Sequence, residues 1–204
     1  MIVAVAALKG GVGKTTTAVY LSALASGGGR RPVTLIDADP QASAADWLEA
    51  ADAEGHLGHV ELEEAPTERL LAKALARIVD SDDEDQIGIV DTPPGDERLL
   101  GKALELADVV VIPTRVGGVE TARVEAVLPL IPRRRPKGLV ISSARTYTRD
   151  HAETVDWWAE RGLPVWGSIP ERVSIASGPE QELAEDGLEA YRGVWRRALR
   201  AARG

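Results

Sequence analysis

The sequence predicts an α/β fold in which a doubly wound, mostly parallel sheet carries helices on both faces. Short apolar runs alternate along the chain with longer stretches of helical pattern. The runs are nearly continuous, as expected for strands buried on both faces of a parallel sheet. Polar and charged residues also follow several runs directly. In such sheets the carboxyl ends of the strands are where ligands bind.

The strands and helices can be placed from these runs. Six strands are predicted, at residues 2–8, 33–37, 87–91, 109–113, 138–142 and 164–169. The clearest helical stretches are 16–26 and 68–79. The charged run 80–85 is predicted as a solvated loop, and the basic run 132–137 as a loop before a strand. A chain of 204 residues without an internal repeat suits one domain, 1–204.

Composition excludes several classes of protein. The chain contains no cysteine, which rules out disulfides, thiolate metal sites and iron–sulfur clusters. No apolar run approaches the ~20 residues of a membrane-spanning helix, and the N-terminus lacks the features of a signal peptide. The net charge of −8 argues against a protein that is basic all over, but allows a local basic patch. We therefore expect a soluble cytoplasmic protein.

The segment after the first strand, LKGGVGKTTT, is almost a phosphate-binding loop of the pattern G-x-x-x-x-G-K-[ST]. Gly13, Lys14 and Thr15 fit this pattern. Its first glycine is replaced by Leu8, and a second cation, Lys9, stands where the pattern requires nothing. The loop follows an apolar strand and opens a helix, which is the context that this motif requires.

Each part of the loop has a physical role. Glycines allow successive backbone N–H groups to point inward at an anion, and the helix N-terminus adds its positive end. Lys14 is placed to contact the β- and γ-phosphates, and the Thr15 hydroxyl to ligate Mg²⁺. The loop residues expected to bend around the phosphates are Gly10, Gly11, Val12 and Gly13.

Three carboxylates follow or end the next two predicted strands. Asp91 ends an apolar strand, where a charge is costly unless it has a function such as holding hydrated Mg²⁺. Asp37 and Asp39 stand at the end of the second strand, before a turn at Pro40. One of this pair could face the metal and the other an attacking water. A purely structural role as caps remains open for all three.

The motifs KGGVGKTTTAVYLSALAS, LIDADPQASAADW and IVDTPPG resemble those of the ParA family of DNA-partitioning ATPases. The short chain looks most similar to the small ParF-type members, which lack an N-terminal DNA-binding extension. Only the first 95 residues carry specific motifs. The resemblance implies a P-loop NTPase fold of the deviant Walker A class, with ATP and Mg²⁺ as cofactors.

The resemblance also implies a role for the extra lysine. In ParA-like proteins the early lysine reaches across a nucleotide-sandwich dimer to the ATP of the partner, and here that residue is Lys9. A second cation would offset charge that develops on the phosphoryl oxygens, as an arginine finger does. Because it acts on the other copy, dimerisation and hydrolysis become linked.

The remaining roles are carried over from the family in the same way. Lys14 and Thr16 would contact phosphates, Thr15, Asp37 and Asp91 would hold Mg²⁺, and Asp39 would position the hydrolytic water. The segment IPERV, which contains Pro170, stands where family members often read adenine. Glu171 replaces an arginine that is common there, and Tyr20 replaces a common asparagine in the first helix.

The C-terminal stretch 188–203 predicts an amphipathic helix with a cationic face. Arg192, Arg196 and Arg200 form a row opposite the apolar side. Three interpretations remain open. The helix could simply close the domain with solvated arginines, the row could bind DNA phosphates non-specifically, or it could meet a membrane surface.

The resemblance, together with the cationic C-terminal stretch, implies an ATPase that forms a homodimer with ATP and binds DNA non-specifically. Hydrolysis, stimulated by a ParB-like centromere-binding protein, would release it, so that the cycle segregates a plasmid, a chromosome or other cargo. Such a protein would be nucleoid-associated in the cytoplasm. The alternatives are a membrane-associated MinD-like regulator and a biosynthetic ligase of the cobyrinate or dethiobiotin type.

Overall fold

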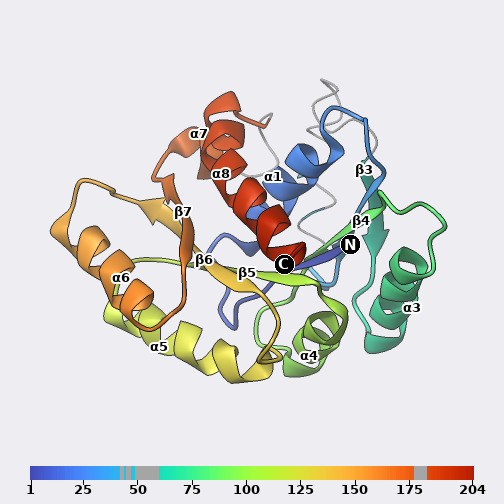
Figure 1. Cartoon of the computed structure of the whole chain (residues 1–204), viewed down its shortest axis with the longest axis horizontal. Coiled ribbons are helices and arrows are strands. Elements are labelled where there is room, and N and C mark those ends of the chain that lie inside the picture. The colour runs from blue at the N-terminus through green and yellow to red at the C-terminus, as the bar shows by residue number, and fades with distance from the viewer. Residues whose placement is uncertain (42–43, 45–46, 49–59, 177–182) are drawn as a thin grey trace.

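Figure 1 shows the computed structural model, which describes residues 1–41, 44, 47–48, 60–176 and 183–204. A seven-stranded sheet in the order β3-β2-β4-β1-β5-β6-β7, with every neighbouring pair parallel, confirms the predicted fold class. The strands are β1 Ile2–Val5, β2 Val33–Asp37, β3 Val60–Glu64, β4 Ile87–Asp91, β5 Val109–Thr114, β6 Lys137–Ala144 and β7 Val165–Pro170.

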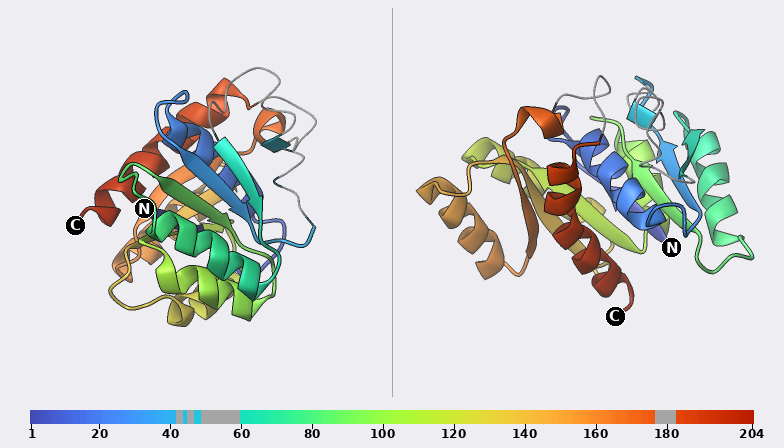
Figure 2. Two further views of the ribbon diagram at one scale, coloured as in Figure 1. Left: turned by 90° about the vertical axis from the view of Figure 1, so that its right-hand side faces the viewer. Right: turned by 90° about the horizontal axis from the view of Figure 1, so that it is seen from above.

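Helices cover both faces of this sheet. Figures 1 and 2 show α1, α7 and α8 on one face and α3, α4, α5 and α6 on the other. Their bounds are α1 Lys14–Ser26, α3 Glu68–Val79, α4 Glu97–Leu106, α5 Gly118–Val127, α6 Arg149–Glu160, α7 Val173–Ala176 and α8 Glu185–Ala202, with a short 3-10 turn η1 at Leu128–Leu130. None of the described helices is both long and apolar enough to span a membrane.

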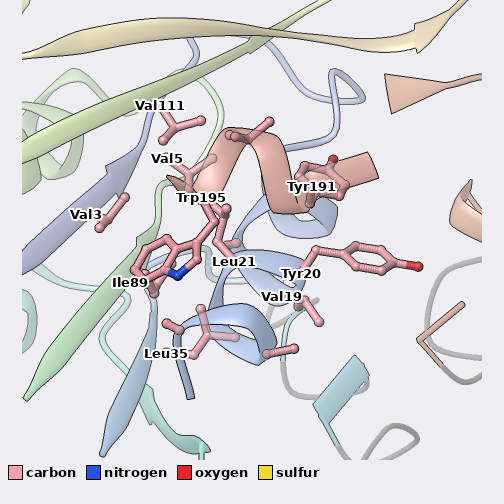
Figure 3. Close-up of a cluster of buried hydrophobic side chains, with 14 of the residues drawn as sticks. Val3, Val5, Val19, Tyr20, Leu21, Leu35, Ile89, Val111, Tyr191 and Trp195 are labelled. Atoms are coloured by element: carbon pink, nitrogen blue, oxygen red, sulfur yellow. The ribbon is translucent and has the colours of Figure 1, made fainter. Parts of the chain in front are cut away.

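The sheet separates two apolar cores, which explains the continuous apolar runs. In β1, Val3 and Val5 face α1 and α8, while Ile2 and Ala4 face the opposite helices. Figure 3 shows the first of these cores, with side chains from β1, α1 and α8 packed together. Because alternate residues of a strand point to opposite faces, a strand between two cores must be apolar at every position.

The strand β3 is absent from the sequence prediction. Its sequence VELEE contains no apolar run, because it lies at the edge of the sheet. Val60 and Leu62 pack against the first core, whereas Glu61 points away from it and is exposed. The first strand also ends at Val5 rather than at residue 8, where the chain enters the phosphate loop.

The C-terminal helix α8 packs against α1 and β7. Its buried side chains include Tyr191, Val194, Trp195 and Ala198, which confirms the apolar side expected from the sequence. The helix begins at Glu185, three residues before the predicted start at 188. It runs from the carboxyl end of the sheet toward the amino ends of the strands (Figure 2).

Candidate nucleotide site

A cavity of about 660 Å³ opens at the carboxyl ends of the strands. Its lining includes most of the residues singled out in the sequence, namely Gly10, Gly11, Gly13, Lys14, Thr15, Thr16, Asp39 and Pro170. These residues come from the loop before α1, the turn after β2 and the end of β7. The parallel sheet brings them together because its strands all end on the same side.

The loop between β1 and α1 has a backbone shape that requires glycine. Gly11 and Gly13 have φ angles of 73° and 89°, in the left-handed region that side chains rarely adopt. A Cβ on Gly13 would also lie 3.0 Å from Ser142 Oγ. The Gly13 carbonyl oxygen accepts a hydrogen bond from Thr17 N at 2.9 Å, which starts the helix directly behind the loop.

Lys14 is the cation at the centre of this loop. Its side chain is 6% exposed, and Nζ donates a hydrogen bond to the Lys9 carbonyl oxygen at 2.9 Å. Burial lowers the pKa of Lys14, while the nearby carboxylates of Asp91 and Asp39 raise it. A desolvated ammonium group in a glycine-rich loop is well placed to attract a multiply charged anion.

Asp91 lies beside the start of the same helix. Its Oδ2 accepts a hydrogen bond from Thr15 Oγ1 at 2.6 Å, while Oδ1 is buried without a hydrogen-bond partner among the described residues. Burial raises the pKa of Asp91 to about 7, against the opposing effect of the Thr15 hydrogen bond. A carboxylate with one unused oxygen next to a threonine hydroxyl is the donor set that P-loop proteins present to Mg²⁺.

The two carboxylates after β2 are placed differently. The oxygens of Asp37 accept backbone hydrogen bonds from Asp39 N at 2.9 Å and Ala44 N at 3.0 Å, and burial raises the pKa of its carboxyl group. Asp37 therefore stabilises the turn after β2. In the register of the sheet, it lies beside Asp91 of β4. Asp39 lines the cavity and accepts a hydrogen bond from Gln41 N at 3.0 Å.

In the described ranges, no group of three or more acidic, histidine or cysteine residues is arranged to hold a metal ion. The motif DPQASAADW continues past Gln41 through positions 42–43 and 45–46, which lie outside the described residues.

Lys9 does not line this cavity. Its Nζ lies 3.0 Å from Glu120 Oε1 at the start of α5, and Arg123 Nη1 lies 2.6 Å from the same oxygen. The Lys9 side chain is 43% exposed, so this ion pair is open to solvent. The structure therefore separates the two lysines of the loop, with Lys14 in the cavity and Lys9 on the β5 side.

The segment containing Pro170 forms the far wall of the cavity. Ile169, Pro170 and Ile175 supply apolar surface there. Glu171, which stands where the family commonly has arginine, is paired with Arg145 at 2.6 Å. The carboxylate is thus held by a cation of the neighbouring loop.

The sequence analysis missed several further cavity-lining residues, among them three with polar side chains from three different elements. Arg115 follows β5, Ser142 lies near the end of β6, and Tyr191 comes from α8. Applying the strand-end rule to the fourth and fifth predicted strands, as well as to the first three, would have found Arg115 and Ser142. No local signal identifies Tyr191, because the helix packing that brings it here is set by the whole fold.

The arginine row of α8 lies on the exposed side of the helix. Arg192 pairs with Glu189 at 2.9 Å. Arg196 and Arg200 are exposed, and neither has an ion pair with another described residue. Of the three, these two are the arginines whose charge is available to a ligand.

Comparison with curated proteins identifies relatives over most of the chain. It is 35% identical over 180 residues to the maintenance of carboxysome distribution protein A of Gloeobacter kilaueensis, covering 81% of this chain and 74% of that protein. It is 31% identical over 217 residues to the chromosome-partitioning ATPase Soj of Thermus thermophilus, covering 87% and 84%.

Solved structures share the fold at lower identity. A Borrelia burgdorferi protein assigned to plasmid partition and bound to AMPPNP has a TM-score of 0.75 at 21% identity, covering 98% of both chains. The septum site-determining protein MinD of Pyrococcus horikoshii, complexed with Mg-ADP, has a TM-score of 0.73 at 19% identity, covering 96% of this chain and 94% of that one. Residues 3–184 match the CobQ/CobB/MinD/ParA nucleotide binding domain. This match, the two relatives and the P-loop fold agree, and the chain belongs to the CobQ/CobB/MinD/ParA nucleotide-binding family.

Proposed function

We propose that residues 1–204 act as one ATPase domain that dimerises on ATP, binds DNA non-specifically and releases it after hydrolysis. The observation that carries this proposal is the glycine loop, whose buried Lys14 and neighbouring Thr15 line one cavity, with Asp91 hydrogen-bonded to Thr15. ATP and Mg²⁺ are the cofactors that these groups fit. When bound, they supply the phosphoryl group and a second positive charge.

Different residues of the site are assigned to the phosphates, to the cation and to the attacking water. The loop N–H groups and Lys14 would bind the phosphates, and Thr16 at the cavity wall would contact the phosphate nearest the sugar. Thr15 and Asp91 would hold the cation, and Asp37 would act on it through water, because the Asp37 oxygens already accept backbone hydrogen bonds in the turn. Asp39 faces the cavity and orients the attacking water.

Lys9 acts on the second copy of the chain. Its side chain does not line the cavity of its own chain and is 43% exposed, so it is accessible to another molecule. The pair with Glu120 is solvent-exposed on the lysine side, and such pairs stabilise by only ~0–1 kcal/mol, so it opens readily. A cation supplied by the partner would make hydrolysis depend on dimerisation.

DNA binding is assigned to the exposed side of α8. Arg196 and Arg200, with Arg192 beside them, present a row of exposed positive charge, which suits phosphate contacts. The relatives that distribute carboxysomes and partition chromosomes support a cargo-positioning cycle. A ParB-like centromere-binding protein would stimulate turnover, and the ATPase would associate with the nucleoid.

The packing of α8 argues against membrane attachment as in a MinD-like regulator. An interfacial helix must place its apolar side in the lipid. Here Tyr191, Val194 and Trp195 are buried against α1 and the sheet, so that side is already occupied. A ligase role would require a small acid substrate and is tested below.

The test measures ATP hydrolysis, sedimentation and binding to DNA of unrelated sequences, each with ATP and with ADP. We expect a dimer and salt-sensitive DNA binding with ATP only. Anionic liposomes and small carboxylic acids serve as the comparison ligands. Binding to liposomes without DNA binding would favour the membrane regulator, and ATP turnover that requires an acid would favour the ligase.

A further inference from the structure

Three hydroxyl groups lie together beneath the phosphate loop. Thr17 Oγ1 of α1 and the Tyr191 hydroxyl of α8 are 3.1 Å apart, and both residues are buried. Ser142 of β6 is 7% exposed, and its Oγ makes no hydrogen bond of normal geometry with the described residues. This oxygen would be 3.0 Å from a Cβ on Gly13, so the cluster touches the underside of the loop. Ser142 and Tyr191 also line the nucleotide cavity.

Tyr191 is firmly seated between α8 and α1. Its ring stacks on Tyr20 with centroids 5.0 Å apart and planes inclined by 12°. Gly187, one turn earlier on α8, lies so close that a Cβ there would be 2.5 Å from the Tyr20 ring. Figure 3 shows Tyr191 and Trp195 reaching from α8 into the core that also holds Tyr20. Because these contacts leave little room, a displacement of α1 must be transmitted to α8.

The hydrogen-bonding pattern offers two arrangements. A hydroxyl can donate one hydrogen bond and accept two, so the Tyr191 hydroxyl can bond Thr17, Ser142 or both. Thr17 follows Thr16 in the first turn of α1, directly behind the residues that surround the phosphates. Tightening of the loop around an anion would move Thr17 and Gly13 relative to Ser142. The occupant of the cavity would therefore decide which partner Tyr191 holds.

We propose that Tyr191 is a positioning residue that couples occupation of the phosphate loop to the placement of α8 through its hydrogen bond with Thr17. Arg196 and Arg200 follow it by five and nine residues, on the side about 140° and 180° away around the helix. A helix moves as one body, so a shift at Tyr191 displaces the arginine row. The effect on DNA rests on the proposed function, whereas the effect on α8 does not.

The test uses Tyr191→Phe, which keeps the stacked ring and removes only the hydroxyl. Thr17→Val removes the other partner, and Thr17→Ser restores a hydroxyl at the same position. Tyr147→Phe is the matched control, since Tyr147 is 86% exposed and does not belong to the hydroxyl cluster of Thr17, Ser142 and Tyr191. Hydrogen–deuterium exchange is followed over α8 and over the phosphate loop, with and without Mg-ATP. Sedimentation of the same samples measures the fraction of dimer, so that proteins are compared at equal dimer formation.

In the wild type and in Tyr147→Phe, Mg-ATP should protect amides of both segments. In Tyr191→Phe and Thr17→Val, the protection of the loop should persist. The ATP-dependent protection of α8 should fall about fivefold, as expected for loss of one buried hydrogen bond. Thr17→Ser should restore it. Unchanged protection of α8 in Tyr191→Phe, or no ATP-dependent protection of α8 in the wild type, would overturn the proposal. The ratio of DNA affinity with ATP to that with ADP, measured in parallel, should fall by the same factor. If α8 responds while no protein binds DNA, the coupling stands and the proposed DNA function fails.

Discussion

At the scale of single residues, the candidate site combines two charges that the fold keeps out of water. Lys14 and Asp91 are both almost fully buried, and burial shifts their pKa values toward the neutral forms. Such an arrangement is unfavourable in a protein that binds nothing, because desolvated charges without full pairing cost free energy. It becomes favourable when an anion and a cation enter together.

Lys14→Ala should abolish ATP binding, because it removes the one buried ammonium group of the loop. We expect the affinity, measured by titration with a fluorescent ATP analogue, to fall by at least about 100-fold, as for loss of a charge-assisted contact in a desolvated site. Lys102→Ala is the matched control, since that lysine pairs with Glu105 on the surface of α4. Tight ATP binding by Lys14→Ala would remove the loop from the proposed site.

Asp39→Ala should separate binding from hydrolysis. If Asp39 orients the water, the variant binds Mg-ATP normally, hydrolyses it about 100-fold more slowly and accumulates as a dimer. Asp39→Asn distinguishes chemistry from folding, because an amide oxygen can still accept the hydrogen bond from Gln41 N. A loss of nucleotide binding in both variants, seen in the same titrations, would assign Asp39 a structural role instead.

The raised pKa of Asp91 makes stability depend on pH. Its pKa is about 7 in the folded chain and near 3.8 ordinarily, so the folded protein binds this proton more tightly than the unfolded one. The contribution to the free energy of unfolding therefore falls as pH rises between these two values. The measurement is urea denaturation at pH 5 and pH 8, with chelator and without nucleotide. Between these two pH values the free energy of unfolding of the wild type should fall, relative to that of Asp91→Asn, by on the order of 2 kcal/mol. Parallel pH profiles for the two proteins would contradict this account.

The sequence does not predict individual contacts between residues that are far apart in the chain. Lys9 was recognised from its motif, but its partner Glu120 is 111 residues away and carries no motif of its own. The same holds for Tyr191, which meets Thr17 across 174 residues. Spacing predicts which residues share a strand end. It does not predict which side chains pair, because pairing depends on the packing of several elements at once.

At the scale of elements, continuous apolar runs predicted six of the seven strands, and two of them, 33–37 and 87–91, with the observed bounds. A continuous apolar run identifies a strand that is buried on both faces. It does not identify β3, because the alternation of Val60, Glu61, Leu62 and Glu63 is typical of an edge strand with only one face packed on the core. A search for period-two alternation would have identified it.

The arginine side of α8 gives a prediction at this scale. Arg196→Ala with Arg200→Ala should weaken binding to all DNA sequences and reduce its salt dependence, because phosphate contacts release counterions without reading bases. Dimerisation with ATP should persist, since neither residue lines the cavity.

Arg69→Ala with Arg77→Ala on α3 removes equal charge from the opposite face of the sheet and is the control. Fluorescence anisotropy with ATP over a range of salt concentrations measures the effect. DNA binding equal to that of the wild type would make α8 a closing helix only, and the basic segment 132–137 would become the next surface to examine.

At the scale of the whole molecule, the position of Lys9 predicts how two copies meet. Lys9→Ala should bind ATP but remain monomeric in sedimentation with ATP, and should lose DNA affinity only as a consequence. Glu120→Gln is the informative partner variant, because it frees the ammonium group from its ion pair and should not weaken the dimer. A Lys9→Ala protein that dimerises like the wild type would exclude a role across the interface.

The outer border of the sheet at β3 bears on what happens when many copies of the chain are concentrated in one place. An exposed border strand can recruit the same strand of a neighbour and extend the sheet from molecule to molecule, which is how ordered aggregates grow. Here that seam would bring the exposed carboxylates of Glu61 and Glu64 against their own copies, whereas Glu63 is paired with Arg77. Like charges facing each other across paired strands oppose such growth. A high local concentration of this chain therefore does not by itself favour joining of one sheet to the next along that border.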